Sequence, residues 1–207
     1  MFRFVAMFAC DYYVPAFFLG QYPKYRAQFS ILYAAMCAVC GLSSSIQGGV
    51  LSDKYKTKSH RAYSYIAIGG ALLSWPFQVM SCLTLNNFWI SITGVGGKYL
   101  FGENFWGPNI AMISNSCPQK KLGNYISAQN FFNILAGCLT TLIFGSAVNM
   151  FNMANSPASI GRLVAVFCSI GYGGSCLAWW KAGKHFKAMQ EAEGKFAGGE
   201  EGAPALA

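Results

Sequence analysis

Charged residues are scarce in this sequence and absent from long stretches of it. Only 11% of the 207 residues are Asp, Glu, Lys or Arg, against about 25% in a typical soluble domain. Four segments contain none of them: 27–52, 62–97, 122–161 and 163–180. A segment inside a bilayer must be apolar and must satisfy its own backbone hydrogen bonds, which favours helices. The sequence therefore predicts an all-α membrane protein with the lipid bilayer as its surroundings.

Acidic residues are rarer than basic ones, and membrane topology accounts for the imbalance. The chain has 15 Lys and Arg against 7 Asp and Glu, which gives a net charge of +8. The basic residues occupy short polar segments and the C-terminal tail, as the positive-inside rule requires. Because no basic arm is interleaved with aromatic side chains for base stacking, we predict no nucleic-acid partner.

Residue groups typical of catalysis, cofactors or metals are also missing. His60 and His185 lie in basic segments, away from any Ser or Cys nucleophile. The glycine-rich segment 94–98 lies in an apolar stretch and lacks the spacing of a phosphate loop. Cys37 and Cys40 form a CxxC pair among Ala, Met and Val, and we interpret them as packing residues. The sequence predicts no enzyme activity, no cofactor and no metal.

Six apolar segments are long enough to cross a bilayer as helices, which takes about 20 residues. They cover roughly residues 2–19, 28–51, 62–84, 88–115, 123–151 and 160–182. Lys24, Arg26 and Arg162 fall on one side of the membrane, and Lys98 falls inside a span. Eleven basic residues fall on the other side of the membrane: Arg3, Lys54, Lys56, Lys58, Arg61, Lys120, Lys121, Lys181, Lys184, Lys187 and Lys195. This asymmetry predicts that both termini face the cytoplasm, or the matrix if the membrane is an organellar inner membrane.

The chain divides into a transmembrane domain over residues 1–190 and a tail over 191–207. Residues 184–195 can continue the last span as a polar amphipathic helix. The tail ends in the low-complexity sequence AGGEEGAPALA, a composition that cannot bury enough apolar surface to fold by itself.

Three sequence patterns resemble the major facilitator superfamily of transporters. In the loop after the second span, Gly49, Asp53 and Lys54 match the family's cytoplasmic motif, although Lys56 and Thr57 depart from it. Segments 105–113 (FWGPNIAMI) and 117–123 (CPQKKLG) resemble the fourth helix and following loop of a six-helix half. Tyr12-Tyr13-Val14-Pro15 and Tyr22-Pro23 resemble the start of a C-terminal half.

The resemblance implies half of the family's fold. Each half consists of two inverted three-helix repeats, and full members have twelve helices in two such halves. The implied partner is a second six-helix half, which could be a copy of this chain or another chain. A transporter-derived module inside a larger membrane complex is the alternative.

Segments 11–15 (DYYVP) and 103–108 (ENFWGP) show a trace of the inverted repeat, because both run from an acid through aromatic residues to a proline. In the family these helices line the central cavity. Chance clustering is the competing interpretation, since 16% of the chain is aromatic. The candidate pathway residues from these segments are Asp11, Tyr12, Tyr13, Glu103 and Trp106.

An ionised carboxylate near the bilayer centre is costly, so such groups usually face a cavity or a partner. This makes Asp11 and Glu103 candidates for proton coupling. They could equally be structural, with Asp11 near an interface and Glu103 paired with Lys98. A spacing of five is unfavourable for a pair on one helix face, but a bend at Gly102 would relieve it.

Polar side chains recur at steps of four along the fifth span, which places them on one helix face. They can line a polar pathway, or they can form interhelical hydrogen bonds with a close contact at the glycine; we prefer the second interpretation. The stripe consists of Gln129, Asn133, Gly137 and Thr141. Together with Lys98, Gln129 and Asn133 complete the candidate pathway.

Two functions are compatible with these patterns. The first is secondary transport of a small solute, in which this chain supplies one half or a fragment of the pathway. Proton coupling is compatible with this function. The second is a non-transporting structural subunit derived from such a transporter. The loop motif and the intramembrane acids favour transport, whereas the half length and the altered motif favour the structural role.

Overall fold

The structure is a computed structural model that describes residues 1–56, 59 and 61–192. These residues form helices joined by short turns, without any strand among them. The elements in chain order are α1 (Phe2–Gln21), η1 (Pro23–Tyr25), α2 (Arg26–Tyr55), α3 (Ala62–Leu83), α4 (Phe88–Gly102), η2 (Glu103–Phe105), α5 (Trp106–Ser116), η3 (Gln119–Lys121), α6 (Leu122–Met150), η4 (Met153–Asn155) and α7 (Pro157–Ala192).

Five continuous helical segments are long and apolar enough to cross a membrane. They are Phe2–Gln21, Pro23–Tyr55, Ala62–Leu83, Gln119–Met150 and Pro157–Ala192. Five of the six predicted spans therefore have a continuous helical counterpart. The predicted fourth span, 88–115, is divided into α4, η2 and α5, so the structure does not confirm it as a sixth continuous span.

The break in the fourth segment has a local cause in the backbone. Pro108 has no amide hydrogen, so an unbroken α-helix would leave the carbonyl of Asn104 without its usual donor. That carbonyl instead faces α2, where a Cβ atom at Gly48 would overlap it. The side-chain amide of Asn104 occupies the space beside Gly70 of α3 in the same way. The break is thus held between glycines of two neighbouring helices.

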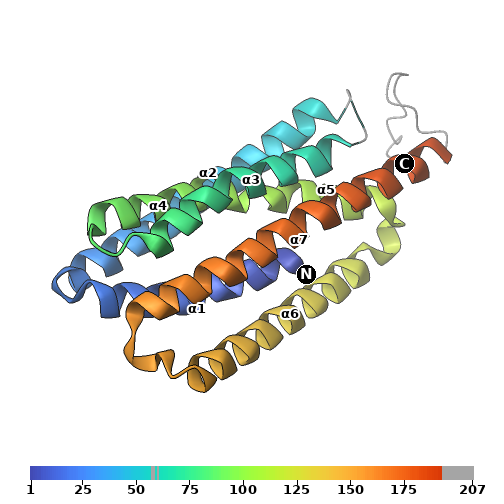
Figure 1. Cartoon of the computed structure of the whole chain (residues 1–207). Helices are drawn as coiled ribbons and strands as arrows, with labels where there is room; N and C mark the ends of the chain where they lie inside the picture. The colour runs from blue at the N-terminus through green and yellow to red at the C-terminus, as the bar shows by residue number, and fades with distance from the viewer. Residues whose placement is uncertain (57–58, 60, 193–207) are drawn as a thin grey trace.

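The helices form an elongated bundle in which α7 packs along α1 and α3, and α4 packs against α2 and α3 (Figure 1). A Cβ atom at Gly171 would lie 2.7 Å from the amide nitrogen of Ala6, so α7 and α1 meet backbone to backbone. The largest side chains buried in this core include Phe17, Phe144 and Tyr172. Helix α6 lies at one edge, beside α1 (Figure 1).

The polar connections alternate between the two ends of the bundle. The end of α2, the start of α3 and the α5–α6 connection lie at the same end as the C-terminal part of α7, and the α1–α2, α3–α4 and α6–α7 connections lie at the opposite end (Figure 1). Most of the basic residues in the described part of the chain belong to the elements at the first end, in agreement with the predicted grouping of charges. Arg3 is an exception, because its side chain is only 7% exposed and lies within the bundle. Counting it with the loop cations was wrong.

The last helix extends well past the predicted end of its span. Helix α7 continues to Ala192, as expected for an amphipathic extension. Its final turns pack on the ends of other helices: the ring of Phe186 contacts Tyr63 of α3, and Gln190 donates a hydrogen bond to the carbonyl of Asn115. Most of the predicted tail, residues 193–207, lies outside the described residues, as do Lys58 and His60.

Candidate functional site

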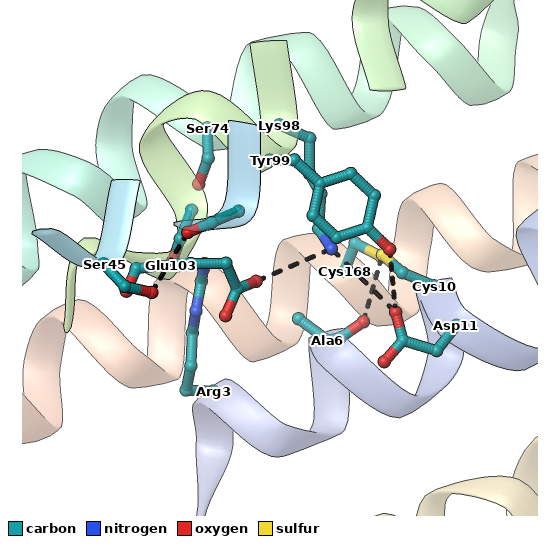
Figure 2. Close-up of polar contacts among 12 residues, drawn as sticks. Arg3, Ala6, Cys10, Asp11, Ser45, Ser74, Lys98, Tyr99, Glu103 and Cys168 are labelled. Carbon is teal, nitrogen blue, oxygen red and sulfur yellow. Dashed lines mark hydrogen bonds and ion pairs between the residues drawn. The ribbon is translucent and has the colours of Figure 1, made fainter. Parts of the chain in front are cut away.

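Two buried cations and two carboxylates from three separate helical segments come together in the bundle (Figure 2). The Lys98 ammonium lies 4.0 Å from Asp11 Oδ1 and 3.9 Å from Glu103 Oε1. Lys98 and Glu103 belong to the broken segment, so the predicted pairing between them is present, and the bend after Gly102 makes the spacing of five possible. The additional contact with Asp11 of α1 brings both candidate acids to one lysine.

The Lys98 side chain is almost completely enclosed. It is 2% exposed, and its Nζ lies 3.6 Å from the centre of the Tyr99 ring. The ammonium has no hydrogen-bond partner within the described residues, because both carboxylates are beyond hydrogen-bonding distance. A buried ammonium with unused donors is costly, so this geometry favours a further acceptor between Lys98 and the acids.

A chain of hydroxyl groups leads away from Asp11. Tyr99 donates a hydrogen bond of 3.2 Å to Asp11 Oδ1, and the hydroxyls of Tyr99 and Tyr33 are 3.0 Å apart. Asp11 is partly open, with 37% of its side chain exposed, whereas the side chain of Glu103 is 11% exposed. Asp11 is therefore the more accessible of the two carboxylates.

Glu103 is held in place by aromatic neighbours. The indole Nε1 of Trp106 donates a hydrogen bond of 3.0 Å to Glu103 Oε2. The Trp106 ring in turn packs against Phe105 and, edge to face, against Phe4 of α1. Because both of its oxygens have a partner within 4 Å, Glu103 has less freedom to bind another group than Asp11.

A groove between α1, α2 and α4 gives access to the acids. It encloses about 750 Å³, and its wall includes Asp11, Tyr33, Tyr99, Glu103 and Ser45. Lys98 lies behind this wall. The arrangement can bind a small cation or a polar solute at the carboxylates, and can exchange either with the medium in the groove.

Arg3 extends the charged cluster on the other side of Glu103. It donates a hydrogen bond to the carbonyl of Gly102, and its guanidinium carbon lies 4.4 Å from the centre of the Tyr172 ring. Its Nη1 is buried and has no partner within the described residues. Together with Lys98, Arg3 balances the formal charges of Asp11 and Glu103.

Arg3 also lines a second cavity, of about 440 Å³, between the start of α1 and helices α5, α6 and α7. Gln129 and Asn133 from the predicted polar stripe reach this cavity, and Asn109 of α5 joins them. Gln129 and Asn109 exchange two hydrogen bonds, of 2.7 and 3.2 Å. Both interpretations of the stripe, a polar pathway and interhelical hydrogen bonding, therefore apply to its first two residues. Gln129 and Asn133 line a cavity and also form hydrogen bonds to other segments.

The rest of the stripe is packing. A Cβ atom at Gly137 would lie 2.6 Å from the Phe8 ring of α1. The hydroxyl of Tyr13 donates to the carbonyl of Thr141, and the Tyr13 ring stacks on Phe144 at 3.7 Å between centres. Tyr13 therefore attaches α1 to α6 rather than lining the groove.

Tyr12 points in a different direction from its neighbour Tyr13. Its side chain is 60% exposed, and its ring lies 5.8 Å from that of Phe8 on the same helix. The carboxylates of Asp11 and Glu103 pair instead with Lys98, Tyr99 and Trp106.

The interactions of Asp53 and Lys54 in the loop motif do not involve the charged cluster. Asp53 pairs with Lys56 at 3.1 Å, and both side chains are more than half exposed. Lys54 lies over the ring of its neighbour Tyr55. The close helix approach predicted at Gly49 is present, because a Cβ atom at Gly107 of α5 would lie 2.6 Å from the amide nitrogen of Gly49. The Cβ direction of Gly49 itself is open, whereas that of Gly48 points at the Asn104 carbonyl, since consecutive helical residues point about 100° apart.

Sequence reasoning missed Arg3, Tyr33, Tyr99 and Asn109. Arg3 carried a signal, because it is flanked by phenylalanines within an apolar run. Tyr99 directly follows the intramembrane lysine, and Asn109 follows the proline of the broken segment. Metal binding was not predicted, and residues 1–56, 59 and 61–192 contain no group of three His, Cys, Asp or Glu placed to hold an ion.

Comparison with known proteins gives relatives that are named as transporters. The chain is 28% identical over 166 residues to the "Probable galactarate/D-glucarate transporter GudP" of Bacillus subtilis (strain 168), a match that covers 75% of this chain and 36% of that protein. It is 28% identical over 167 residues to GarP of Escherichia coli (strain K12), named likewise, over 73% and 36% of the two chains.

The chain thus spans little more than a third of these curated relatives. No family model matches the sequence. No solved structure matches it either. The relatives are members of the major facilitator superfamily, so the matches support the predicted likeness to a transporter of this type and an integral, multi-pass membrane location.

Proposed function

We propose that this chain is one half, or a piece, of a secondary transporter that moves a small polar solute across a membrane. In this proposal, α4, η2 and α5 together form a sixth, broken crossing. The observation that carries the proposal is the cluster of Asp11, Lys98 and Glu103, which lies beside an open groove in an otherwise apolar bundle. Ionisable groups inside a membrane are costly and usually belong to a pathway.

The solute class that best fits is a sugar-acid anion. The relatives are named for galactarate and D-glucarate, which carry carboxylates and hydroxyls. The free Nη1 of Arg3 can donate to a carboxylate, and the amides of Asn109, Gln129 and Asn133 can bind hydroxyls in the same cavity. Asp11, as the more open acid, would take up the coupling proton from the groove.

The same proposal includes a second six-helix half and an orientation. Exposed apolar side chains of α2, among them Val39, Leu42 and Ile46, are about two-thirds exposed and offer a surface to that half, whether a copy or another chain. The end of the bundle that bears most of the basic residues would face the cytoplasm or an organellar matrix.

Uptake of radiolabelled D-glucarate into cells that express the full chain tests this function. Asp11→Asn and Glu103→Gln should each lower uptake at least about tenfold at unchanged membrane levels, since each removes a group of the pathway. Glu191→Gln is the matched control, because it makes the same chemical change as Glu103→Gln at an exposed carboxylate outside the cluster and the loop motif. Normal uptake by both cluster variants would contradict the proposal.

A structural role in a larger membrane complex is the second candidate. The apolar faces that α2 and α6 leave exposed, for example Val50 at 61% and Leu142 at 67%, suit a permanent neighbour as well as lipid. Its test is the native mass after mild detergent extraction, with all components identified. Stoichiometric partners, lost when residues 196–207 are deleted, would support it; a lone functional dimer would exclude it.

A further inference from the structure

A separate cavity lies at the corner where α2 meets α3, at the end of the bundle rich in basic residues. It encloses about 320 Å³ and is lined by Tyr55, Ser59, Ala62, Tyr65 and Ile66. None of these residues belongs to the charged cluster or to the amide-lined cavity. The proposed transport function therefore leaves this corner without a role.

The corner has a strong excess of positive charge. The described residues 54–56, 59 and 61 include Lys54, Lys56 and Arg61 and no acid. The preceding acid, Asp53, is already paired with Lys56. Arg61 comes directly before α3, and its Nε is buried without a hydrogen-bond partner in the described part of the chain. An anion at this corner would supply the missing acceptor.

An apolar stripe begins at the same cavity and runs along α3 toward the middle of the bundle. Tyr65, Leu72 and Leu73 are 50–54% exposed, and their spacing places them on one helix face with Gly69. A Cβ atom at Gly69 would meet nothing within 4 Å. The glycine therefore leaves an open notch in the stripe, one turn beyond Tyr65.

We propose that this corner and stripe form a binding site for one anionic phospholipid. The phosphate lies at the cavity beside Arg61, and an acyl chain follows the stripe across the notch at Gly69. Charge complementarity selects an anionic head group, because clustered Lys and Arg at a membrane surface attract such lipids. A free phosphate would use the corner alone, whereas a lipid uses both features.

Native mass spectrometry of the full chain in detergent, with equal amounts of phosphatidylglycerol and phosphatidylcholine, measures this preference directly. The unmodified protein should retain phosphatidylglycerol over phosphatidylcholine. Arg61→Gln should lower phosphatidylglycerol binding about fivefold, the effect expected for one cation at the surface. Gly69→Leu should lower it similarly by filling the notch. Gly69 has open space at its Cβ position, and Arg61 lies just before α3. If one variant fails to fold, the other decides the question.

The control is Gly173→Leu, which adds the same side chain at an α7 position where a Cβ atom also meets nothing within 4 Å. It should leave phosphatidylglycerol binding unchanged. Equal retention of the two lipids, or an equal loss in the control, would overturn the proposal. Full displacement of phosphatidylglycerol by millimolar inorganic phosphate would also overturn it, because the site would then bind only the phosphate group.

Discussion

Replacing Lys98 with methionine removes the ammonium that lies 3.9 Å from Glu103 and 4.0 Å from Asp11, and it keeps most of the apolar stem. At these separations each attraction is about 4 kcal/mol for an effective dielectric constant near 20. Asp11 is more than a third exposed, so water screens its share. Glu103, at 11% exposure of its side chain, is the group left without compensation.

Removing one member of a buried ion pair costs about 3–5 kcal/mol, because the other charge stays buried. For a protein of this size each kcal/mol lowers Tm by about 2–4 °C. We therefore expect Lys98→Met to lower Tm by about 10 °C at pH 7.5. A thiol-reactive dye can follow the transition in detergent, since Cys82 and Cys168 are fully buried in the folded state.

A second substitution distinguishes lost charge from lost packing. Adding Glu103→Gln to Lys98→Met removes the orphaned carboxylate while leaving an oxygen for the hydrogen bond from Trp106. This double variant should regain most of the lost stability. Adding Asp11→Asn instead should regain less, because Asp11 reaches water. The reasoning is refuted if Lys98→Met melts with the unmodified protein, or if Glu103→Gln restores nothing.

Four further single substitutions follow from the packing, each measured by the same thermal unfolding. Gly48→Ala places a methyl group against a backbone carbonyl of the broken segment and should cost about 1–3 kcal/mol; Gly49→Ala, with open space at its Cβ position, should instead stabilise by about 0.5–1 kcal/mol. Phe144→Ala removes a ring that is 0% exposed and should cost about 3–5 kcal/mol, so a loss below 1 kcal/mol would contradict its place in the core. Gln129→Ala should cost about 1–3 kcal/mol by breaking two hydrogen bonds to Asn109; in an Asn109→Ala background the cost should shrink, and equal costs in both would show that the pair is not coupled.

The membrane class and most of the helices could be predicted because they depend on local composition. A run without charges specifies a span wherever it occurs. The break in the fourth segment also has local signals in the sequence, at Gly102 and Pro108. The uncharged character of most of 88–115 nevertheless led to the prediction of one span. The prediction needed the rule that a proline leaves an upstream carbonyl unpaired.

The charged cluster was predictable only as far as it is local. Lys98 and Glu103 are neighbours in sequence, and the bend between them was anticipated from Gly102. That Asp11 joins them depends on how α1 lies against α4, and no sequence pattern specifies that contact. Arg3 was misplaced for the same reason, since its partners, the Gly102 carbonyl and the Tyr172 ring, are distant in sequence.

The packing of α1 along α7 has a consequence for how the protein is made. About 135 residues separate the end of α1 from the start of α7, and ribosomes add roughly 5–20 residues per second. The helix that carries Arg3 and Asp11 therefore waits roughly seven to 27 seconds for its main neighbour to be synthesised. Lys98 is absent for the first part of that interval, and Tyr172 of α7 is absent throughout. Insertion machinery or the lipid interface must shelter α1 for that time, which makes biogenesis a demanding step for this fold.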